Sequence, residues 1–527
     1  MRSSTVVARE GVPSAEAALE QLERILASTD FDASPRSRAF VRFILEETLA
    51  GRQQGLTQTA IATRVFSRRE DFDPTVDPIV RIQAGRLRRS LERYYLMSGA
   101  GDRVRIGLPR GTYVPVVSWA VEGKGRPAEA LASGPASADR DGFPSVVVRL
   151  FEAEGVPGLE AAAARLREQL CLEMGRYGDV RVVRSRETRQ QRQASCADGD
   201  FELSARVSDD AAATRITARL VECRSATQVW AEDFRGTAER GAFCEDTARR
   251  IAAQVASEQG VVARQLWVAQ RQQPEAEPSA YGALLLSYRF FFNREAADFA
   301  PACDALRRTV RERPECGLAW VQLSRLYGTN YSFELAPLET PIEDAITFAQ
   351  TAVRLDPASQ RARVALGGAF LLNGDLEAGR AEAEAAYQLN PDSLVYLEWV
   401  GWLLALLGDW ERGVAVIRRS MARNPNHIPV GHHALWADHL RRGEVEEAYQ
   451  AALQYKDATF FVRALMRACC LGHLGRAAEA KRAVAELLER KPDFPSRGRV
   501  LIGRHVKFPD LLERVVDGLG KAGLTLD

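Results

Sequence analysis

The sequence predicts a multidomain α+β protein with three parts: an N-terminal helical unit that ends in a β-hairpin, a central α/β domain and a C-terminal α-solenoid. Three observations predict this architecture. An arginine-rich helical stretch precedes a hairpin before residue 120, strands and helices alternate over residues 143–265, and prolines recur at a fixed spacing after residue 280. A chain of 527 residues is long enough for about three domains that each bury a core.

A helix is predicted to start at Asp77-Pro78, because an aspartate side chain accepts free N–H bonds and proline tolerates the first helical position. Apolar residues then recur at helical spacing and form one stripe, made by Val80, Ala84, Leu87, Leu91 and Tyr94. Residues 78–117 hold eight arginines and only two acidic residues. Positive charge is therefore concentrated on this helix and the hairpin, as contacts to DNA phosphates require.

The segment from Leu56 to Val117 resembles the DNA-binding domain of OmpR/PhoB-type regulators, a winged helix-turn-helix. TVDPIVRIQAGRLRRSL is similar to the recognition helix of that family, and RGTYVPV is similar to its terminal wing strand. The resemblance implies a winged-helix unit over residues 1–120 whose recognition helix enters the major groove. The residues expected to contact DNA are Arg81, Arg86, Arg88, Arg89, Arg93, Arg105 and Arg110. The loop SRREDFDPTVDP is acidic and no receiver domain precedes the unit, so control by phosphorylation is not expected.

The next part begins with a linker predicted over residues 121–142, which are rich in Gly, Ala, Pro and Ser. Residues 143–265 then predict a strand in SVVVRLF, a helix over Leu159–Arg176, a strand in VRVVRSR, a three-stranded meander and one long helix over Ala238–Arg264. This order, with the pattern ITARLVECRSATQVWAEDF, resembles the amino-terminal-like domain of TolB in bacterial regulators and in cyclase relatives with tetratricopeptide repeats. The resemblance implies a coupling or interaction module without catalytic residues.

The C-terminal part repeats with a period of 34 residues, which three prolines mark: Pro357, Pro391 and Pro425. Gly374 and Gly408 stand 17 residues before the last two prolines. This is the period of tetratricopeptide repeats, in which pairs of helices stack into a solenoid. We expect about six repeats over residues 283–494, within an array over 280–527. The terminal segment DLLERVVDGLGKAGLTLD is expected to form a capping helix.

Stacked repeats form a concave inner surface from the first helix of each pair. Extending the repeat register places on this surface Arg325, Val364, Leu371, Glu398, Trp402, His433 and Leu440. The set is apolar with a few polar groups, which favours a hydrophobic peptide or helix as the ligand. The alternative is that the surface packs against the central domain of the same chain or against a second copy.

Catalytic, metal and cofactor sites are not predicted. The sequence contains no P-loop, GxGxxG, GxSxG or HExxH motif and no CxxC pair. His432 and His439 are two helical turns apart and could hold a metal together with a third ligand, but repeat helices commonly carry histidines on solvated faces. The net charge is +1, so affinity for nucleic acid has to come from a local surface. Without an apolar signal core or a run of 18 apolar residues, a cytoplasmic protein with no membrane contact is expected.

The leading hypothesis is a cytoplasmic one-component transcriptional regulator. It would bind double-stranded DNA through the N-terminal unit and receive a protein or peptide signal through the repeats. A homodimer is plausible, because a single winged helix makes few specific contacts. The alternative is a non-enzymatic interaction scaffold in a cyclase-like or stress-signalling pathway whose winged helix does not bind DNA. A continuous basic surface would favour the regulator, whereas a surface interrupted by Glu70, Asp71 and Asp73 would favour the scaffold.

Overall fold

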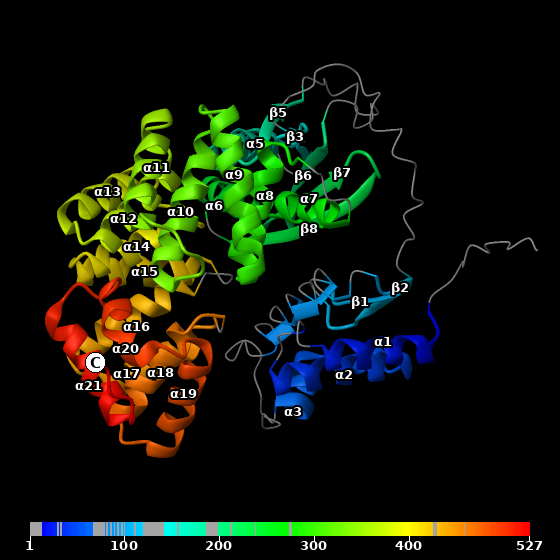
Figure 1. Cartoon of the computed structure of the whole chain (residues 1–527). Coiled ribbons are helices and arrows are strands. Elements are labelled where there is room, and N and C mark those ends of the chain that lie inside the picture. Colours follow the sequence, from blue (N-terminus) through cyan, green and yellow to red (C-terminus); the bar gives the residue numbers. More distant parts are fainter. Residues whose placement is uncertain are drawn as a thin grey trace, which may run out of the picture. The chain divides into compact units, whose positions relative to one another are not determined.

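In the computed structural model the chain forms two compact units, Met1–Ser137 and Ala138–Asp527 (Figure 1). The predicted linker lies outside the described residues, apart from Gly142. The structure describes residues 13–28, 31, 34–66, 80, 83–84, 87–88, 90–91, 94–95, 98–99, 101–109, 112–119, 142–154, 158–185, 199–210, 213–237, 239–272, 277–424, 429–457 and 459–527.

The N-terminal unit consists of helices followed by a two-stranded antiparallel hairpin. Two of its helices begin at serine caps, since Ser14 and Ser34 each accept a hydrogen bond from a backbone N–H three residues on. Residues 80–95, where described, are helical as well. The other elements described in this unit are α1 (Ala15–Ala27), α2 (Pro35–Leu49), η1 (Gln53–Gly55), α3 (Gln58–Phe66), β1 (Val104–Gly107) and β2 (Val116–Trp119).

The core of this unit confirms the apolar stripe read from the sequence. All five stripe residues are at most 3% exposed, namely Val80, Ala84, Leu87, Leu91 and Tyr94. They share one buried cluster with Phe40 and Ile44 of α2 and with Ile61 of α3. The helical spacing therefore identified correctly which side of residues 80–94 faces the core.

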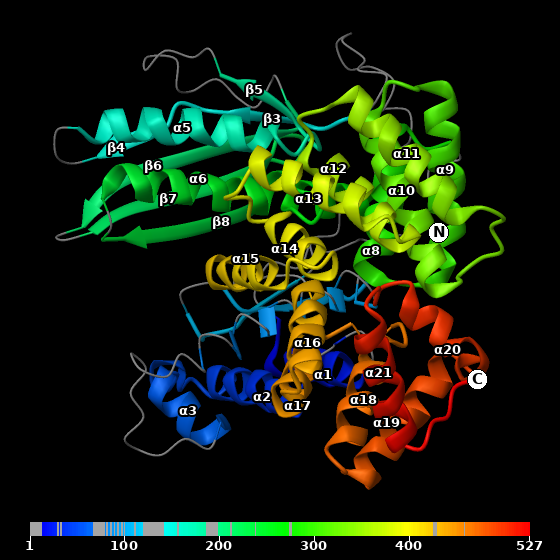
Figure 2. The ribbon, with the colours of Figure 1, turned by 90° about the vertical axis from the view of Figure 1, so that its left-hand side faces the viewer.

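The central region is a mixed sheet in the order β5-β3-β6-β7-β8, with β4 pairing alongside β6. β3 runs parallel to β5 and β6, and β6, β7 and β8 form the predicted antiparallel meander. α5 and α6 pack against each other on one face of the sheet (Figure 2). The bounds are β3 (Ser145–Val148), β4 (Glu152–Glu154), α5 (Leu159–Gly175), β5 (Arg181–Arg184), β6 (Phe201–Asp210), β7 (Ala213–Glu222), β8 (Thr227–Gly236), α6 (Arg240–Ala256) and α7 (Val261–Gln272).

The single long helix expected over Ala238–Arg264 is wrong, because the chain forms α6 and α7 with a turn between them. Ser257 ends α6 in an extended conformation, and the N–H of Gly260 donates to its carbonyl oxygen at 2.7 Å. A Cβ on Gly260 would lie 2.6 Å from the carbonyl oxygen of Val255, so the turn depends on this glycine. The break puts Glu258 in a turn instead of on a helix face.

The C-terminal region is a helical repeat array built from consecutive pairs of helices. The described residues contain the six expected helix pairs, with a left-handed glycine between the two helices at Gly374, Gly408, Gly443 and Gly475. The inner and outer helices, pair by pair, are α8 (Ala280–Asn293) and α9 (Phe299–Glu312), α10 (Gly317–Phe333) and α11 (Pro341–Leu355), α12 (Gln360–Asn373) and α13 (Leu376–Leu389), α14 (Leu397–Leu406) and α15 (Trp410–Arg423), α16 (Val430–Arg442) and α17 (Val445–Gln454), and α18 (Val462–His473) and α19 (Ala477–Arg490); η3 (Ala296–Asp298) precedes α9.

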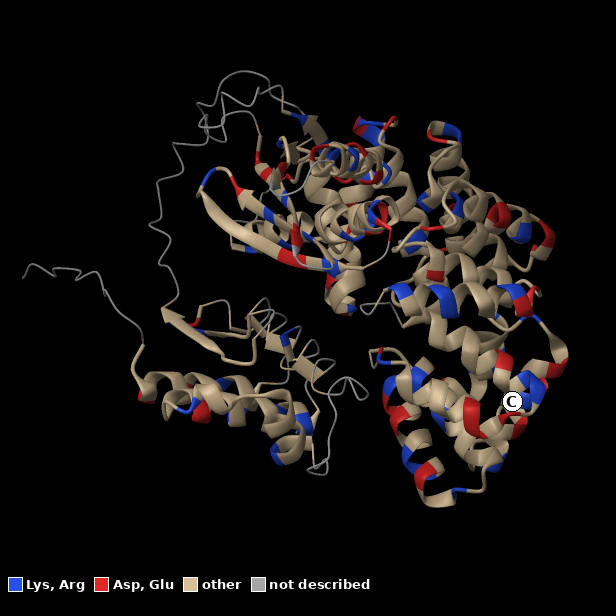
Figure 3. Ribbon diagram, turned by 180° about the vertical axis from the view of Figure 1, so that it is seen from behind, with Lys and Arg blue, Asp and Glu red and all other residues tan. Residues whose placement is uncertain are grey.

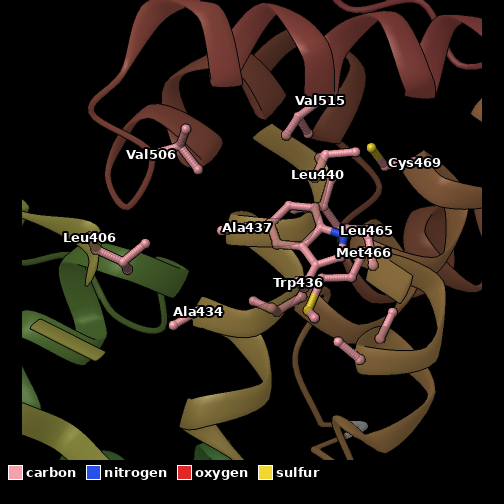
Figure 4. Packing of buried hydrophobic residues seen from close by; sticks show 14 of the residues in the cluster. Leu406, Ala434, Trp436, Ala437, Leu440, Leu465, Met466, Cys469, Val506 and Val515 are labelled. Atoms are coloured by element: carbon pink, nitrogen blue, oxygen red, sulfur yellow. The ribbon is translucent and has the colours of Figure 1, made fainter. Parts of the chain in front are cut away.

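The end of the chain does not simply cap the array. α20 (Phe494–Gly503) was not expected, and the predicted capping helix, α21 (Pro509–Lys521), packs against the inner helices α16 and α18. Figure 4 shows Val515 of α21 close to Leu440 of α16. Gly472 and Gly518 allow this approach, since a Cβ on Gly472 would lie 1.9 Å from the carbonyl oxygen of Gly518. The terminal helix therefore covers an inner surface that we expected to be open.

Candidate functional site

Two of the seven arginines expected to contact DNA, Arg88 and Arg105, belong to the described residues. The Arg105 guanidinium lies 5.0 Å from the ring centre of Tyr95, a cation–π arrangement. The Tyr95 hydroxyl in turn accepts a hydrogen bond from the Ile106 N–H at 2.6 Å, which joins the helix to β1. The other expected contacts lie outside the described residues: Arg81, Arg86, Arg89, Arg93 and Arg110.

Arg88 has a positioning role that the sequence did not predict. Its Nε donates to the carbonyl oxygen of Leu108 at 2.8 Å. Its Nη2 donates to the carbonyl oxygens of Pro109 at 2.9 Å and Thr112 at 3.2 Å. All three acceptors belong to the loop that follows β1. Arg88 therefore fastens the hairpin loop to the helix, and this arrangement fixes the direction in which the hairpin projects.

A buried carboxylate holds the other end of the hairpin. Asp102 accepts hydrogen bonds from the Tyr94 hydroxyl at 2.7 Å, from Gln21 Nε2 at 2.6 Å and from Arg24 Nη1 at 3.1 Å. Burial favours the neutral acid, but these three donors outweigh it and lower the pKa of Asp102. The carboxylate thus joins α1, the helix of residues 80–95 and the start of β1 into one rigid unit.

The inner-surface residues predicted in the array are mostly enclosed, so the prediction of an open groove is wrong for them. Leu371 and Leu440 are completely buried between helices. Glu398 is 2% exposed, and its Oε1 accepts a hydrogen bond from the Gly431 N–H at 2.9 Å near the start of α16. These side chains hold neighbouring repeats together and are not free to bind a partner.

The remaining members of the predicted groove also contact their own chain. Trp402 Nε1 donates to Nδ1 of His433 at 3.1 Å. Val364 is half-buried and packs against both the array core and the core of the central sheet. Arg325 Nη1 lies 2.6 Å from Oε2 of Glu258, the acidic residue in the turn between α6 and α7. The inner surface of the first repeats is therefore covered by the central domain, as the sequence-based alternative proposed.

A buried ionic cluster joins the central domain to the array, and we call it the latch. It comprises Asp179, Glu258, Arg325 and Arg361, together with Tyr288, whose hydroxyl donates to Asp179. Arg361 of α12 is 4% exposed and its Nη2 lies 2.9 Å from Asp179 Oδ2 and 3.3 Å from Glu258 Oε2. Two acids from the central domain thus meet two arginines from the array. Burial by itself raises the pKa of Glu258, but both arginines outweigh it and lower the value to about 2.

Sequence reasoning missed the latch, although one signal was available. Arg361 stands three residues before Val364, on the same side of the first helix of a repeat, so the register could have placed it on the inner surface. Asp179 and Glu258 lie in turns, where no periodicity marks them. Their partners, Arg325 and Arg361, can be identified only from the folded structure, in which the central domain contacts the array.

Charged residues of both signs are interspersed on the array helices (Figure 3). In the described parts of the chain, no helix is long and apolar enough to cross a membrane. The same residues contain no group of three or more His, Cys, Asp or Glu side chains that could hold a metal ion.

Comparison with known proteins gives only a general likeness. The sequence matches no protein-family description, and no curated protein is similar to it. Among solved structures, one neighbour is YrrB, described as a TPR protein with an unusual peptide-binding site; identity is 14%, the match covers 36% of this chain and 94% of that chain, and the TM-score is 0.24. Another is the Cut9–Hcn1 hetero-tetramer of APC/C, with 14% identity, 54% of each chain covered and a TM-score of 0.36.

Proposed function

We propose that this chain is a non-enzymatic, DNA-binding regulator of the cytoplasm. In this proposal the N-terminal unit is a winged helix that binds double-stranded DNA. The second unit, in which the central domain and the repeats are locked together, receives a protein or peptide signal. Two such chains would act as a homodimer on paired half-sites.

The observation that carries the proposal is that residues 80–94 have a buried apolar side and, by helical spacing, an arginine-bearing side opposite to it. The apolar stripe is buried, and helical spacing assigns Arg86, Arg89 and Arg93 to the opposite side. Arg88 and Asp102 hold the hairpin in a fixed position beside this helix. A helix and a hairpin held rigidly next to each other can present arginines to two adjacent stretches of phosphate backbone.

Fluorescence anisotropy of the full-length chain with a labelled random DNA duplex tests the proposal. The titration is made at two salt concentrations. We expect binding that weakens with salt, because cations on the protein release counterions from DNA. Replacing Arg86, Arg89 and Arg93 by alanine should weaken binding and reduce the salt slope by about 3, roughly 1 for each lost phosphate contact.

The matched control replaces Arg36, Arg42 and Arg52 by alanine, which removes the same charge from α2 and the turn after it. Arg42 is partly exposed and paired with Glu23, and Arg52 is exposed and paired with Glu47. If the control weakens binding as much as the test variant, the affinity comes from overall charge and the proposed helix role is refuted. If the wild type does not bind even at low salt, the interaction-scaffold alternative replaces the regulator.

A further inference from the structure

The segment between α20 and α21, residues 504–508, crosses the ends of the inner helices. Arg504 Nη1 donates to the carbonyl oxygen of Tyr331 at the end of α10. Three residues later, Lys507 Nζ donates to the carbonyl oxygen of Leu372 at the end of α12, at 2.9 Å. Both cations therefore meet the carbonyl end of a helix, where the helix dipole favours positive charge.

The same path continues along the following repeats. The Phe508 ring centre lies 5.6 Å from that of Trp410, which begins α15 directly after the end of α14. Farther along, His473 of α18 contacts the carbonyl oxygen of Arg514 through Nε2 at 2.8 Å. α21 also packs against α16. One continuous stretch of chain thus lies across the inner helices from α10 to α18.

His505 occupies a poorly suited place in this path. Its ring centre lies 6.2 Å from that of Trp402, 6.0 Å from that of His433 and 6.5 Å from that of Phe333. Both of its ring nitrogens are enclosed and make no hydrogen bond to any described residue. Burial lowers the pKa of His505 to about 3 and that of His433 to about 4. An enclosed imidazole without hydrogen bonds is unfavourable, so this contact weakens the hold of the array on the segment.

The segment is anchored by Phe494, Leu501, Ile502 and Val506, which are buried in the core of the array. On its more exposed N-terminal side it is held by one carboxylate. Glu334, in the left-handed conformation after α10, lies 2.9 Å from Lys491 Nζ, 2.5 Å from Arg497 Nη2 and 2.9 Å from Arg504 Nη2. Burial by itself raises the pKa of Glu334, but the three cations outweigh it and lower the value to about 2. The side chains of Glu334 and Arg497 are 26% and 44% exposed, so water reaches this fastening.

We propose that residues 491–508 are an autoinhibitory strap, which occupies the inner surface of the array in cis and is released when its Glu334 clasp opens. The inference rests on the proposed role of the array as a receiver of a peptide signal. The clasp is partly exposed to water, whereas Asp179, Glu258 and Arg361 of the latch are at most 7% exposed. The structure therefore separates a permanent junction from one that can open.

The contacts of the strap also define the chemistry of the partner that displaces it. That partner is an extended peptide with a lysine or arginine for the carbonyl end of α12 and an aromatic residue next to it for Trp410. At the place of His505, an apolar side chain would fit the surrounding rings without two unsatisfied nitrogens. The partner thus makes the same contacts as Lys507 and Phe508, and it replaces His505 by a side chain that leaves no unsatisfied nitrogen.

Full-length Glu334→Lys tests the strap, with Glu339→Lys as the control. Glu339 is an exposed residue of the same loop, so the charge change is identical. The readouts are hydrogen exchange at neutral pH and binding of a fluorescein-labelled peptide with the sequence of residues 500–512. In Glu334→Lys we expect faster exchange in residues 494–521 and in α14, and peptide affinity at least tenfold above wild type and control, because the closed strap lowers the competent fraction.

Unchanged exchange in Glu334→Lys would overturn the inference, as would equal peptide affinity for all three proteins. If Glu334→Lys fails to fold by circular dichroism, Arg497→Ala replaces it, since this partly exposed residue supplies only one of the three cations around Glu334. A peptide carrying alanine at the position of Lys507 must bind the opened protein more weakly. None of these readouts involves DNA, so failure of the strap and failure of the DNA-binding proposal are distinguishable.

Discussion

The latch predicts that Arg361→Met destabilises the central domain and the repeats together. The substitution keeps much of the side-chain volume and removes the guanidinium. Asp179, which is 1% exposed, then loses its cation and keeps the Tyr288 hydroxyl, while Glu258 keeps Arg325. A buried carboxylate without a counter-charge is strongly unfavourable.

The magnitude follows from burial and from the size of the unit. Breaking a buried ion pair from one side destabilises a protein by about 3–5 kcal/mol. Residues 138–527 form one compact unit of 390 residues, and unfolding entropy is about 2.1 cal/mol/K per residue near the midpoint, or about 0.8 kcal/mol/K in all. The midpoint of thermal unfolding should therefore fall by about 4–6 °C.

Differential scanning calorimetry of the full-length protein measures the shift. Two transitions are expected, one for each compact unit, and only the one with the larger enthalpy should move. Adding Asp179→Asn to Arg361→Met should restore part of the loss, because it removes the uncompensated charge. A shift below about 1 °C, or no recovery in the double variant, would refute the view that this cluster holds the two regions together.

Three further outcomes are expected. Asp102→Asn should destabilise the N-terminal unit by about 1–3 kcal/mol, because an amide cannot accept hydrogen bonds from all three donors in that site. Only the midpoint of the calorimetric transition with the smaller enthalpy should therefore fall. Gly472→Ala should destabilise the second unit in urea by about 1–3 kcal/mol, since the new methyl group meets backbone, whereas Gly520→Ala, which has nothing within 4 Å, should be neutral or slightly stabilising. The free energy of unfolding measured in urea should decrease as the pH falls from about 6.5 towards 4, because His433 and His505 take up protons in the unfolded state but stay neutral while buried in the folded state. Each histidine contributes a slope of up to about 1.4 kcal/mol per pH unit, and His433→Asn should reduce the total slope.

Periodic features of the sequence translated directly into structure. The spacing of Val80 to Tyr94 identified a buried helix face, and the glycines at 374, 408 and 475 stand in the left-handed turns that they predicted. Local patterns suffice in these cases because each residue responds to neighbours a few positions away. The alternating strands of the meander were predictable for the same reason.

Features that depend on distant partners were not predictable. Glu258 lies in a stretch with helical composition, and the turn around it exists because Gly260 allows a close backbone approach. Leu371 and Leu440 were placed on the correct helices, but whether such residues face water depends on what packs over them. The latch and the strap both bring together residues separated by more than 150 positions, a relation that one sequence does not display.

Because both ends of the array are attached to other parts of the chain, the number of repeats cannot change freely. An open solenoid can gain or lose a repeat, because each unit touches only its neighbours, and it frays from its termini. Here the first inner helices are pinned to the central domain, and Glu334 near the start of the array is joined to Lys491 and Arg497 near its finish. Inserting or deleting a repeat would change the distance between these anchoring points, so the contacts of Glu334, while closed, fix the number of repeats.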